Sequence, residues 1–256
     1  MVRETTTDGF LDNGIQIIQF KSRAHRSGLD AILLAATVPK EESGLVADFG
    51  AGTGAVGMAA AHRCRNIQAD LFEIDPETVE LAVRSLKLPQ NRHLVGRVHP
   101  HCANIANSAE LLSRAEREAN SYNHILINPP FNDANYRRSP QTSKAQAHMF
   151  SPQDPEIWIK TASRLCAEKG RLTLIIRPEN LSTFIEPIQK RFGAIRLLPV
   201  HAKANDTASR LLIGATRGSK TPLRILPPLF IHEENGAFTA KVEEILRGRA
   251  GIDLHG

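Results

Sequence analysis

The sequence predicts an α/β fold in which a doubly wound sheet of seven mostly parallel strands is closed by an antiparallel hairpin and covered by a short N-terminal cap. From residue 45 onward, short apolar or β-branched runs alternate with segments of helical period, which is typical of βαβ units and a parallel sheet. Two later runs have no helix between them and therefore predict the hairpin. No second hydrophobic core is evident, so we expect one domain, with residues 1–40 as the cap and residues 41–256 as its main part.

Five strands and five helices are expected in the repeating part of the chain. The strands are predicted at 45–49, 69–74, 96–101, 124–128 and 171–177, and the helices at 55–65, 76–86, 109–119, 155–167 and 182–191. The second helix has the clearest pattern, because Pro76 stands in its first turn, Glu77 lies beside its positive end and apolar residues recur along one side. The hairpin is predicted to join 194–200 to 210–216, and the cap to contain a strand at 14–20 and a helix at 30–38.

The composition excludes several classes of protein. The chain has 256 residues, of which 41% are apolar and 23% are charged, as in ordinary soluble globular proteins and unlike collagen or disordered chains. No apolar run reaches the roughly 18 residues needed to cross a bilayer, and the first residues are polar rather than signal-like. We therefore expect a cytoplasmic protein with no membrane partner.

The spacing of cysteine and histidine predicts neither a disulfide framework nor a metal site. Cys64, Cys102 and Cys166 are odd in number and far apart, and the close pair His99 and His101 has no third ligand nearby. The formal charge of +5 would concentrate a polyanion such as RNA. A modest basic excess is also common in proteins that never bind nucleic acid, so charge alone does not decide the partner.

A glycine-rich loop follows the first predicted strand and precedes the first predicted helix. Gly50, Gly52 and Gly54 allow the backbone to turn sharply and to approach a ligand closely, while the helix start offers unpaired N–H groups. Glu73, roughly 20 residues further on, would accept hydrogen bonds from a ribose diol. Ile74 would then flank the base, although ordinary packing explains this residue equally well.

The acid before this loop favours a methyl donor over a dinucleotide. Gly52, Gly54 and Gly57 also satisfy the Gly-x-Gly-x-x-Gly spacing of dinucleotide sites. Asp48, however, would repel a pyrophosphate, whereas it could hold the ammonium of the amino acid tail of S-adenosyl-L-methionine, directly or through water. A tight turn with no ligand is the alternative for the glycines.

A second motif stands at the end of the fourth predicted strand. In Asn128-Pro129-Pro130-Phe131, two prolines remove two N–H donors and hold the backbone carbonyls outward at the carboxyl edge of the sheet. Asn128 offers a side-chain carbonyl, Pro129 a rigid main-chain carbonyl and Phe131 a flat apolar face, which together suit a planar group that bears an NH₂. Adenine and a carboxamide are both such groups.

Together these motifs resemble those of the class I S-adenosylmethionine-dependent methyltransferases of the amino type, which have a Rossmann-like fold. The segments 27–34, 222–228 and 242–248 are in addition similar to the bacterial tRNA(Val) adenine-N6 methyltransferase family. The resemblance covers nearly the whole chain and implies S-adenosyl-L-methionine as cofactor, a tRNA adenine beside the anticodon as target and Asp30 as a cofactor-binding residue. Where such enzymes commonly carry an Asp for the cofactor's adenine, this chain has Asn104, whose oxygen can still accept a hydrogen bond.

The expected reaction is an in-line displacement, for which the protein must chiefly align the donor and the acceptor. Hydrogen bonds from the adenine amine to Asn128 Oδ1 and to the Pro129 carbonyl would make its nitrogen more tetrahedral. Phe131 would stack on the base once the base is extruded from its helix or loop.

Two segments are candidates for RNA contact. Residues 132–149 are basic and follow the second motif directly, and we expect them to form a substrate loop. Between residues 201 and 224 stand five bases and one acid, namely Lys203, Arg210, Arg217, Lys220, Arg224 and Asp206. For any one of these side chains, solvated charge is as good an explanation as phosphate contact.

Three other functions remain open at this point. A protein glutamine methyltransferase would present the same NH₂ group to Asn128 and Pro129. A noncatalytic RNA-binding module could retain the cofactor pocket, and an NAD-dependent oxidoreductase would share the glycine spacing but lacks an evident proton donor. RNA, and within that class tRNA, is the preferred partner, and the chain is expected to be a monomer or a homodimer.

Overall fold

The computed structural model describes residues 3–21, 28–129 and 154–255. Its strands are β1 (Thr5–Phe10), β2 (Ile15–Phe20), β3 (Ser43–Phe49), β4 (Asn66–Glu73), β5 (Val98–Cys102), β6 (Tyr122–Ile127), β7 (Cys166–Ile176), β8 (Phe192–His201), β9 (Ala208–Arg217), β10 (Arg224–Ile225) and β11 (Leu229–Phe230). Its helices are α1 (Leu29–Ala35), α2 (Ala55–Arg63), α3 (Pro76–Leu86), α4 (Ser108–Ala115), α5 (Asp154–Leu165), α6 (Leu181–Gln189) and α7 (Ala240–Leu246), with 3₁₀ turns η1 (Pro89–Leu94) and η2 (Pro178–Asn180).

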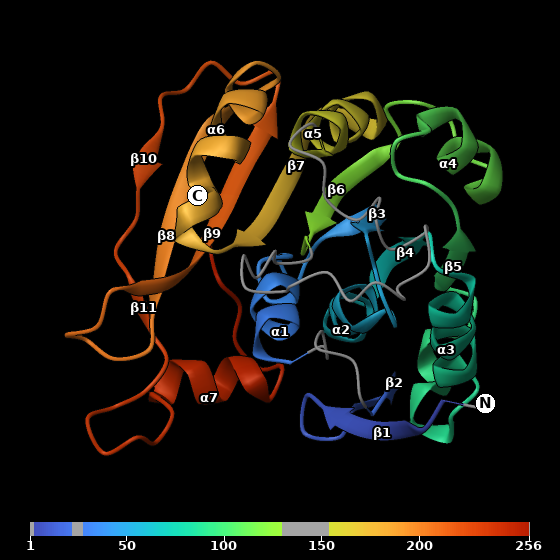
Figure 1. Cartoon of the computed structure of the whole chain (residues 1–256), viewed down its shortest axis with the longest axis horizontal. Coiled ribbons are helices and arrows are strands. Elements are labelled where there is room, and N and C mark those ends of the chain that lie inside the picture. Colours follow the sequence, from blue (N-terminus) through green and yellow to red (C-terminus); the bar gives the residue numbers. More distant parts are fainter. Residues whose placement is uncertain (1–2, 22–27, 130–153, 256) are drawn as a thin grey trace, which may run out of the picture.

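One sheet forms the centre of the molecule (Figure 1), with the strand order β10-β8-β9-β7-β6-β3-β4-β5 and with β11 paired to β8. The strands from β3 to β7 pair in parallel, whereas β9 is antiparallel to both β7 and β8. The α/β fold with a mostly parallel sheet and an antiparallel closing hairpin is therefore confirmed. The two-residue strands β10 and β11 extend the sheet beyond the seven strands that the sequence predicts, because runs this short carry no readable alternation.

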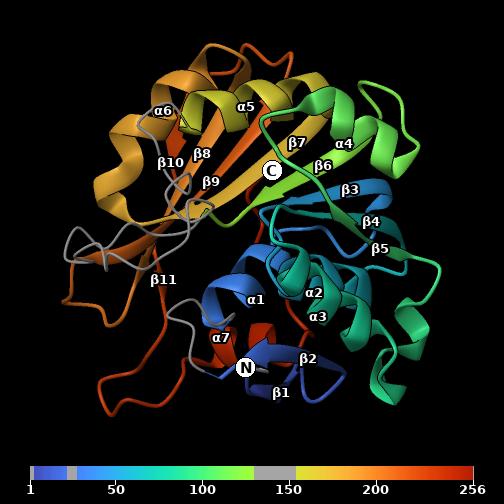
Figure 2. The same cartoon turned by 45° about the vertical axis from the view of Figure 1, so that its right-hand side comes forward.

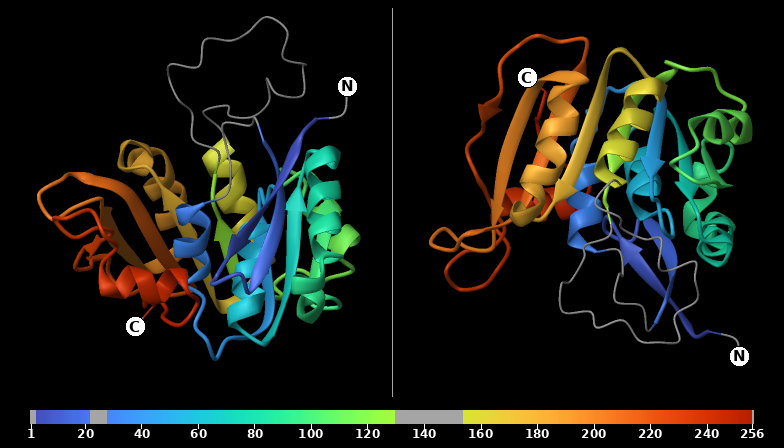
Figure 3. Two further views of the ribbon diagram at one scale, coloured as in Figure 1. Left: turned by 90° about the horizontal axis from the view of Figure 1, so that it is seen from below. Right: turned by 45° about the horizontal axis from the view of Figure 1, so that its top comes forward.

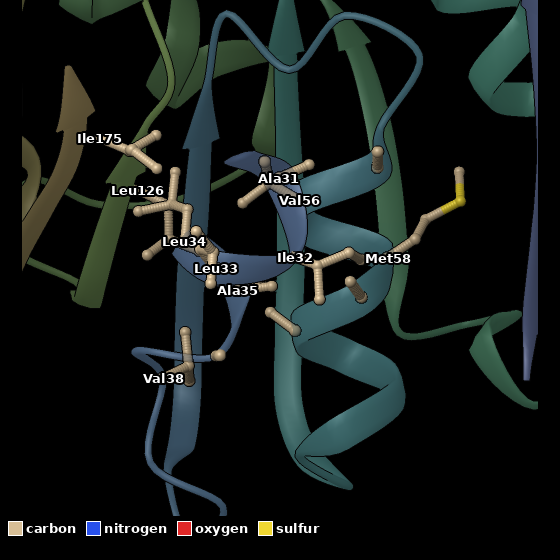
Figure 4. Packing of buried hydrophobic residues seen from close by; sticks show 14 of the residues in the cluster. Ala31, Ile32, Leu33, Leu34, Ala35, Val38, Val56, Met58, Leu126 and Ile175 are labelled. Carbon is tan, nitrogen blue, oxygen red and sulfur yellow. The ribbon is translucent and has the colours of Figure 1, made fainter. Parts of the chain in front are cut away.

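Helices cover both faces of this sheet, α1, α2 and α3 on one face and α4, α5 and α6 on the other (Figure 2). Alternate residues of each strand enter opposite cores: Val46 joins the first cluster, while its neighbour Ala47 joins the second. In the first core, Ile32 of α1 points toward α2, and Leu34 lies near Leu126 of β6 (Figure 4). Burial on both faces explains why the strands read as nearly continuous apolar runs.

The N-terminal cap contains a hairpin rather than the single predicted strand. β1 pairs antiparallel with β2; this strand is not among the predicted ones because Thr5–Phe10 is polar and shows no alternation. The hairpin packs against α2 and α3 (Figure 3). The other edge of β2 is held by side chains: Ser85 Oγ accepts from Ile18 N–H at 2.8 Å, and Asn91 Oδ1 accepts from Gln16 N–H at 3.0 Å. Side chains thus take the place of a further strand at this edge.

Five of the six predicted helix ends lie two to four residues too far along the chain, and two of them show the cause. The predicted helix 155–167 ends at Leu165 because β7 begins at Cys166. The predicted helix 109–119 ends at Ala115, where Glu116 adopts a left-handed conformation with φ of 54°.

Buried polar groups hold the C-terminal segment against α2 and β7. The Arg63 guanidinium donates to the carbonyls of Ala35 and Val38 at the end of α1, at 2.8 and 3.1 Å, and to the carbonyl of Ala250 at 3.2 Å. Further along, His255 Nε2 lies 3.1 Å from Thr173 Oγ1. Burial, followed by the charge of a nearby arginine, lowers the pKa of His255 to about 4.

This pKa makes the docking of the C-terminal segment sensitive to acid. An unfolded histidine takes up a proton near pH 6.5, whereas folded His255 does so only near pH 4, so its contribution to the free energy of unfolding falls as the pH drops between these values. As the pH falls across this window, we expect the free energy of unfolding of the parent chain to drop by up to about 3 kcal/mol more than that of a His255→Gln variant. Urea unfolding of both proteins at several pH values measures the difference, and parallel pH profiles would contradict it.

Candidate active site

The glycine loop between β3 and α2 leaves its backbone open to a ligand. Gly50, Gly52 and Gly54 have φ values of 66°, 57° and 87°, in the left-handed region that glycine alone adopts without strain. A Cβ placed on Gly52 would meet no atom within 4 Å, so this peptide faces open space. Gly54 is the N-cap of α2 and has no side chain to cap it; Gly57 N–H donates to Asp48, so the N–H groups of Ala55 and Val56 are those left for an anionic group.

Asp48 lies beneath this loop at the end of β3 and is 1% exposed. Its Oδ2 accepts from Gly57 N–H at 2.9 Å, whereas its Oδ1 has no hydrogen-bond partner among the described residues. Burial raises the pKa of Asp48 to about 7; the Gly57 N–H opposes this rise and the charge of Glu73 adds to it. The carboxyl group is therefore close to half ionised at neutral pH and has an oxygen free for a cation.

Glu73 joins the end of β4 to the same loop. Its Oε2 accepts from Gly52 N–H at 2.9 Å, and its Oε1 accepts from the N–H groups of Ile74 and Asp75 at 2.8 and 2.9 Å. A carboxylate has about four acceptor positions, so one remains on Oε2 for a ligand. Ile74 beside it is 56% exposed, which ordinary core packing does not explain.

Two other predicted cofactor residues are already engaged within the protein. Asn104 is exposed, and its Oδ1 accepts from Ala106 N–H at 2.9 Å. Asp30, in the first turn of α1, forms an ion pair in which Arg210 Nε donates to its Oδ2 at 2.8 Å. A cofactor group could reach either residue only through acceptor positions that these bonds leave open.

The second motif begins directly beside the glycine loop. In the pairing of β3 with β6, Phe49 lies opposite Ile127, so Asn128 follows next to Gly50 at the carboxyl edge. Asn128 Oδ1 is buried and has no hydrogen-bond partner in the part of the chain that the structure describes. Pro129 is buried as well, whereas Pro130, Phe131 and the predicted substrate loop 132–149 lie outside the described residues.

Two further residues lie beside the loop, and neither is among the predicted site residues. Trp158 of α5 lies against Gly50, since a Cβ on that glycine would come within 3.0 Å of the indole ring. Thr53, within the loop, buries an Oγ1 that has no partner among the described residues. Trp158 is the single tryptophan of the sequence, which could have marked it as a candidate, but its contact with Gly50 and the burial of Thr53 Oγ1 both depend on the folded chain.

The basic residues predicted to contact RNA are not brought together. Arg210 and Arg217 lie near opposite ends of β9, separated by about 23 Å of extended strand. Arg217 donates to Asn120 Oδ1 and Lys203 Nζ to the Glu234 carbonyl, so both have partners within the protein. Lys220 is exposed at the edge of the sheet opposite the glycine loop. Their closeness in sequence therefore does not produce one basic surface.

The described residues contain neither a candidate metal centre nor a candidate membrane helix. No three side chains of His, Cys, Asp or Glu gather there as a metal site. No helix in these ranges combines the length and the apolar character that crossing a bilayer requires.

Comparison with known proteins identifies similar chains over most of this length. A family model described as the methyltransferase small domain matches residues 28–204. The tRNA1(Val) (adenine(37)-N6)-methyltransferase of Flavobacterium psychrophilum is 32% identical over 170 residues, which cover 66% of this chain and 68% of the relative. The protein of the same name from Aliivibrio salmonicida is 29% identical over 191 residues, or 72% and 74% of the two chains.

Among solved structures, a protein described as a predicted O-methyltransferase from Agrobacterium tumefaciens is similar to nearly the whole chain. It superposes with a TM-score of 0.75 at 32% identity and covers 88% of this chain and 98% of its own. Identity at this level over this length makes it a relative in sequence as well as in fold.

The pKa of Asp48 predicts how the affinity for S-adenosylmethionine depends on pH. The ammonium of the ligand prefers the ionised carboxylate, so affinity should rise roughly tenfold from about pH 5.5 to about pH 7, below the range in which an α-amino group loses its proton. Calorimetric titration of the parent chain and of Asp48→Asn measures this rise, which should be absent in the variant. Profiles that run parallel would exclude Asp48 as the titrating group.

Proposed function

Because the chain belongs to the methyltransferase small domain family and is an S-adenosylmethionine-dependent methyltransferase, we propose that it methylates the exocyclic N6 amine of an adenine in tRNA. The observation that carries the proposal is Asn128 Oδ1, a buried acceptor with no partner among the described residues, at the strand end beside the glycine loop. An unmade hydrogen bond at a buried oxygen costs about 1–3 kcal/mol, which a substrate amine would recover.

The loop residues fit the cofactor in charge and in space. We propose that Asp48 Oδ1 takes the ammonium of the amino acid tail and that Glu73 takes the ribose hydroxyls. Ile74 and Asn104 would border the adenine, and Asp30 would contribute through the oxygen that Arg210 leaves open. When bound, S-adenosylmethionine supplies a methyl group on a positively charged sulfur.

The protein's own contribution to the reaction is to hold the target amine. Asn128 Oδ1 and the Pro129 carbonyl would accept its two N–H bonds and make the nitrogen lone pair available in line with the methyl group. In the proposal, Pro130 keeps this backbone rigid and Phe131 stacks on the extruded base. No strong base is needed, because the proton is lost only after the nitrogen has become cationic.

An adenine suits this site better than the other acceptors. A hydroxyl group has a single donor and would leave one of the two acceptors without a partner, which argues against the O-methyltransferase description carried by the A. tumefaciens protein. A glutamine amide offers the same NH₂ group as adenine. The names of the curated relatives favour adenine in tRNA over this amide.

Replacing Asn128 should separate catalysis from cofactor binding. We expect Asn128→Ala to lower methyl transfer by at least about 10²-fold, as when a transition-state hydrogen bond is lost, and to leave the affinity for S-adenosylmethionine within about twofold of the parent. Asn66→Ala, at the exposed start of β4, is the matched control and should keep full turnover. Near-normal turnover of Asn128→Ala would contradict the assigned role.

The product identifies the substrate. Purified protein incubated with methyl-labelled cofactor, total tRNA and a protein extract should place the label in N6-methyladenosine after the tRNA is digested to nucleosides. Label that appears in glutamine of protein, or on an oxygen, would reject the proposed substrate while leaving the methyltransferase activity itself in place.

A further inference from the structure

A cavity of about 480 Å³ lies at the end of α2 that points away from the glycine loop. It is lined by Gly14, His62, Arg65, His93 and Arg97. The nine residues of α2 span about 13 Å, so this cavity is distinct from the candidate active site. None of its lining residues carries a carboxylate.

Two imidazoles form one wall of the cavity. His62 Nδ1 lies 2.8 Å from His93 Nε2, and the two rings meet edge to face with their centroids 4.9 Å apart. One of these two nitrogens donates to the other, and the tautomer decides which of them is the donor. The nitrogen of His62 that this contact does not use, Nε2, faces Gly14, where a Cβ would come within 2.6 Å of it.

Two guanidinium groups add positive charge to the same space. Arg97 Nη1 donates to the carbonyls of Ala61 and Cys64 at 2.9 and 3.3 Å, which fixes its position at the end of α2 without neutralising it. The negative end of the α2 dipole offsets at most about half a charge. The Arg65 carbonyl also accepts from Arg97 Nη1, at 3.3 Å, whereas the exposed Arg65 guanidinium has no hydrogen bond or ion pair within the described ranges.

No negative group compensates this cluster locally. The pKa values of His62 and His93 are both lowered, first by burial and then by cationic neighbours, among them Arg65 and Arg97. Neither imidazole forms an ion pair with a carboxylate within the described residues. A group that brought two negative charges would relieve this repulsion and would favour a proton on His62 Nε2, which would then become a donor.

We propose that this cavity is a binding site for a phosphate group. Arg65 would hold two of its oxygens through the guanidinium fork, His62 would donate from Nε2 once protonated from solvent, and Arg97 would supply a fixed charge. The volume exceeds that of a phosphate and leaves space for an attached sugar, so the group can come from a small phosphorylated ligand or from an RNA backbone. Only the second source rests on the proposed function.

Inorganic phosphate is the direct probe. In imidazole NMR spectra, assigned with His62→Gln and His93→Gln, phosphate titrated at constant ionic strength should shift the His62 and His93 signals in a saturable way. Arg65→Gln should weaken this binding at least tenfold, whereas Arg114→Gln on the exposed side of α4 should leave it unchanged. No saturable shift, or equal binding by the two variants, would overturn the proposal.

Binding of tRNA at several salt concentrations then distinguishes the two sources. If the phosphate belongs to RNA, Arg65→Gln lowers the tRNA affinity and reduces the salt slope by about one, and Arg114→Gln does neither. If a small ligand is the source, both variants bind tRNA equally while phosphate binding still depends on Arg65. The phosphate titration requires no methyl transfer, so its failure and a failure to methylate tRNA are separate results.

Discussion

The in-register pairing of β3 with β4 and β6 is the constraint on which the candidate site depends. Phe49 lies opposite both Phe72 and Ile127, so the residues next after these three, Gly50, Glu73 and Asn128, meet at one edge of the sheet. A slip of one residue would turn every side chain of a strand to its other face. Burial of each strand between two helix layers opposes such a slip, and the hydrophobic core thereby positions the polar groups.

Two buried carboxylates show how the structure separates a supporting role from a chemical one. Asp48 and Asp70 are both 1% exposed. Burial alone would raise the pKa of Asp70, but hydrogen bonds from His101, Tyr122 and Arg117 lower it. The Asp70 side chain thereby links β4 to β5, to β6 and to the segment that follows α4. Asp48 has a single N–H partner on Oδ2, an unpartnered Oδ1 among the described residues and a raised pKa. An unsatisfied carboxyl group of this kind is typical of ligand sites.

The sequence predicts those parts of the molecule that local pattern encodes. The predicted helix 76–86 has the observed bounds because Pro76, its neighbouring Asp75 cap and the apolar spacing all act within one segment. The polar strand β1, the contact of Trp158 with Gly50 and the cavity of Arg65 could not be predicted, since each depends on residues distant in the chain. Residues that are close in sequence can also lie far apart in the fold. The basic residues of β9 stand near opposite ends of that strand and so do not form the predicted RNA-contact surface.

The most direct test of the account is a crystal structure of the chain with S-adenosylhomocysteine and adenosine. In that structure we expect the adenosine N6 atom within about 2.7–3.2 Å of Asn128 Oδ1, with Asp48 Oδ1 facing the ammonium group of the product. An adenosine bound elsewhere, or an Asn128 side chain that turns into the core away from the ligand, would contradict it.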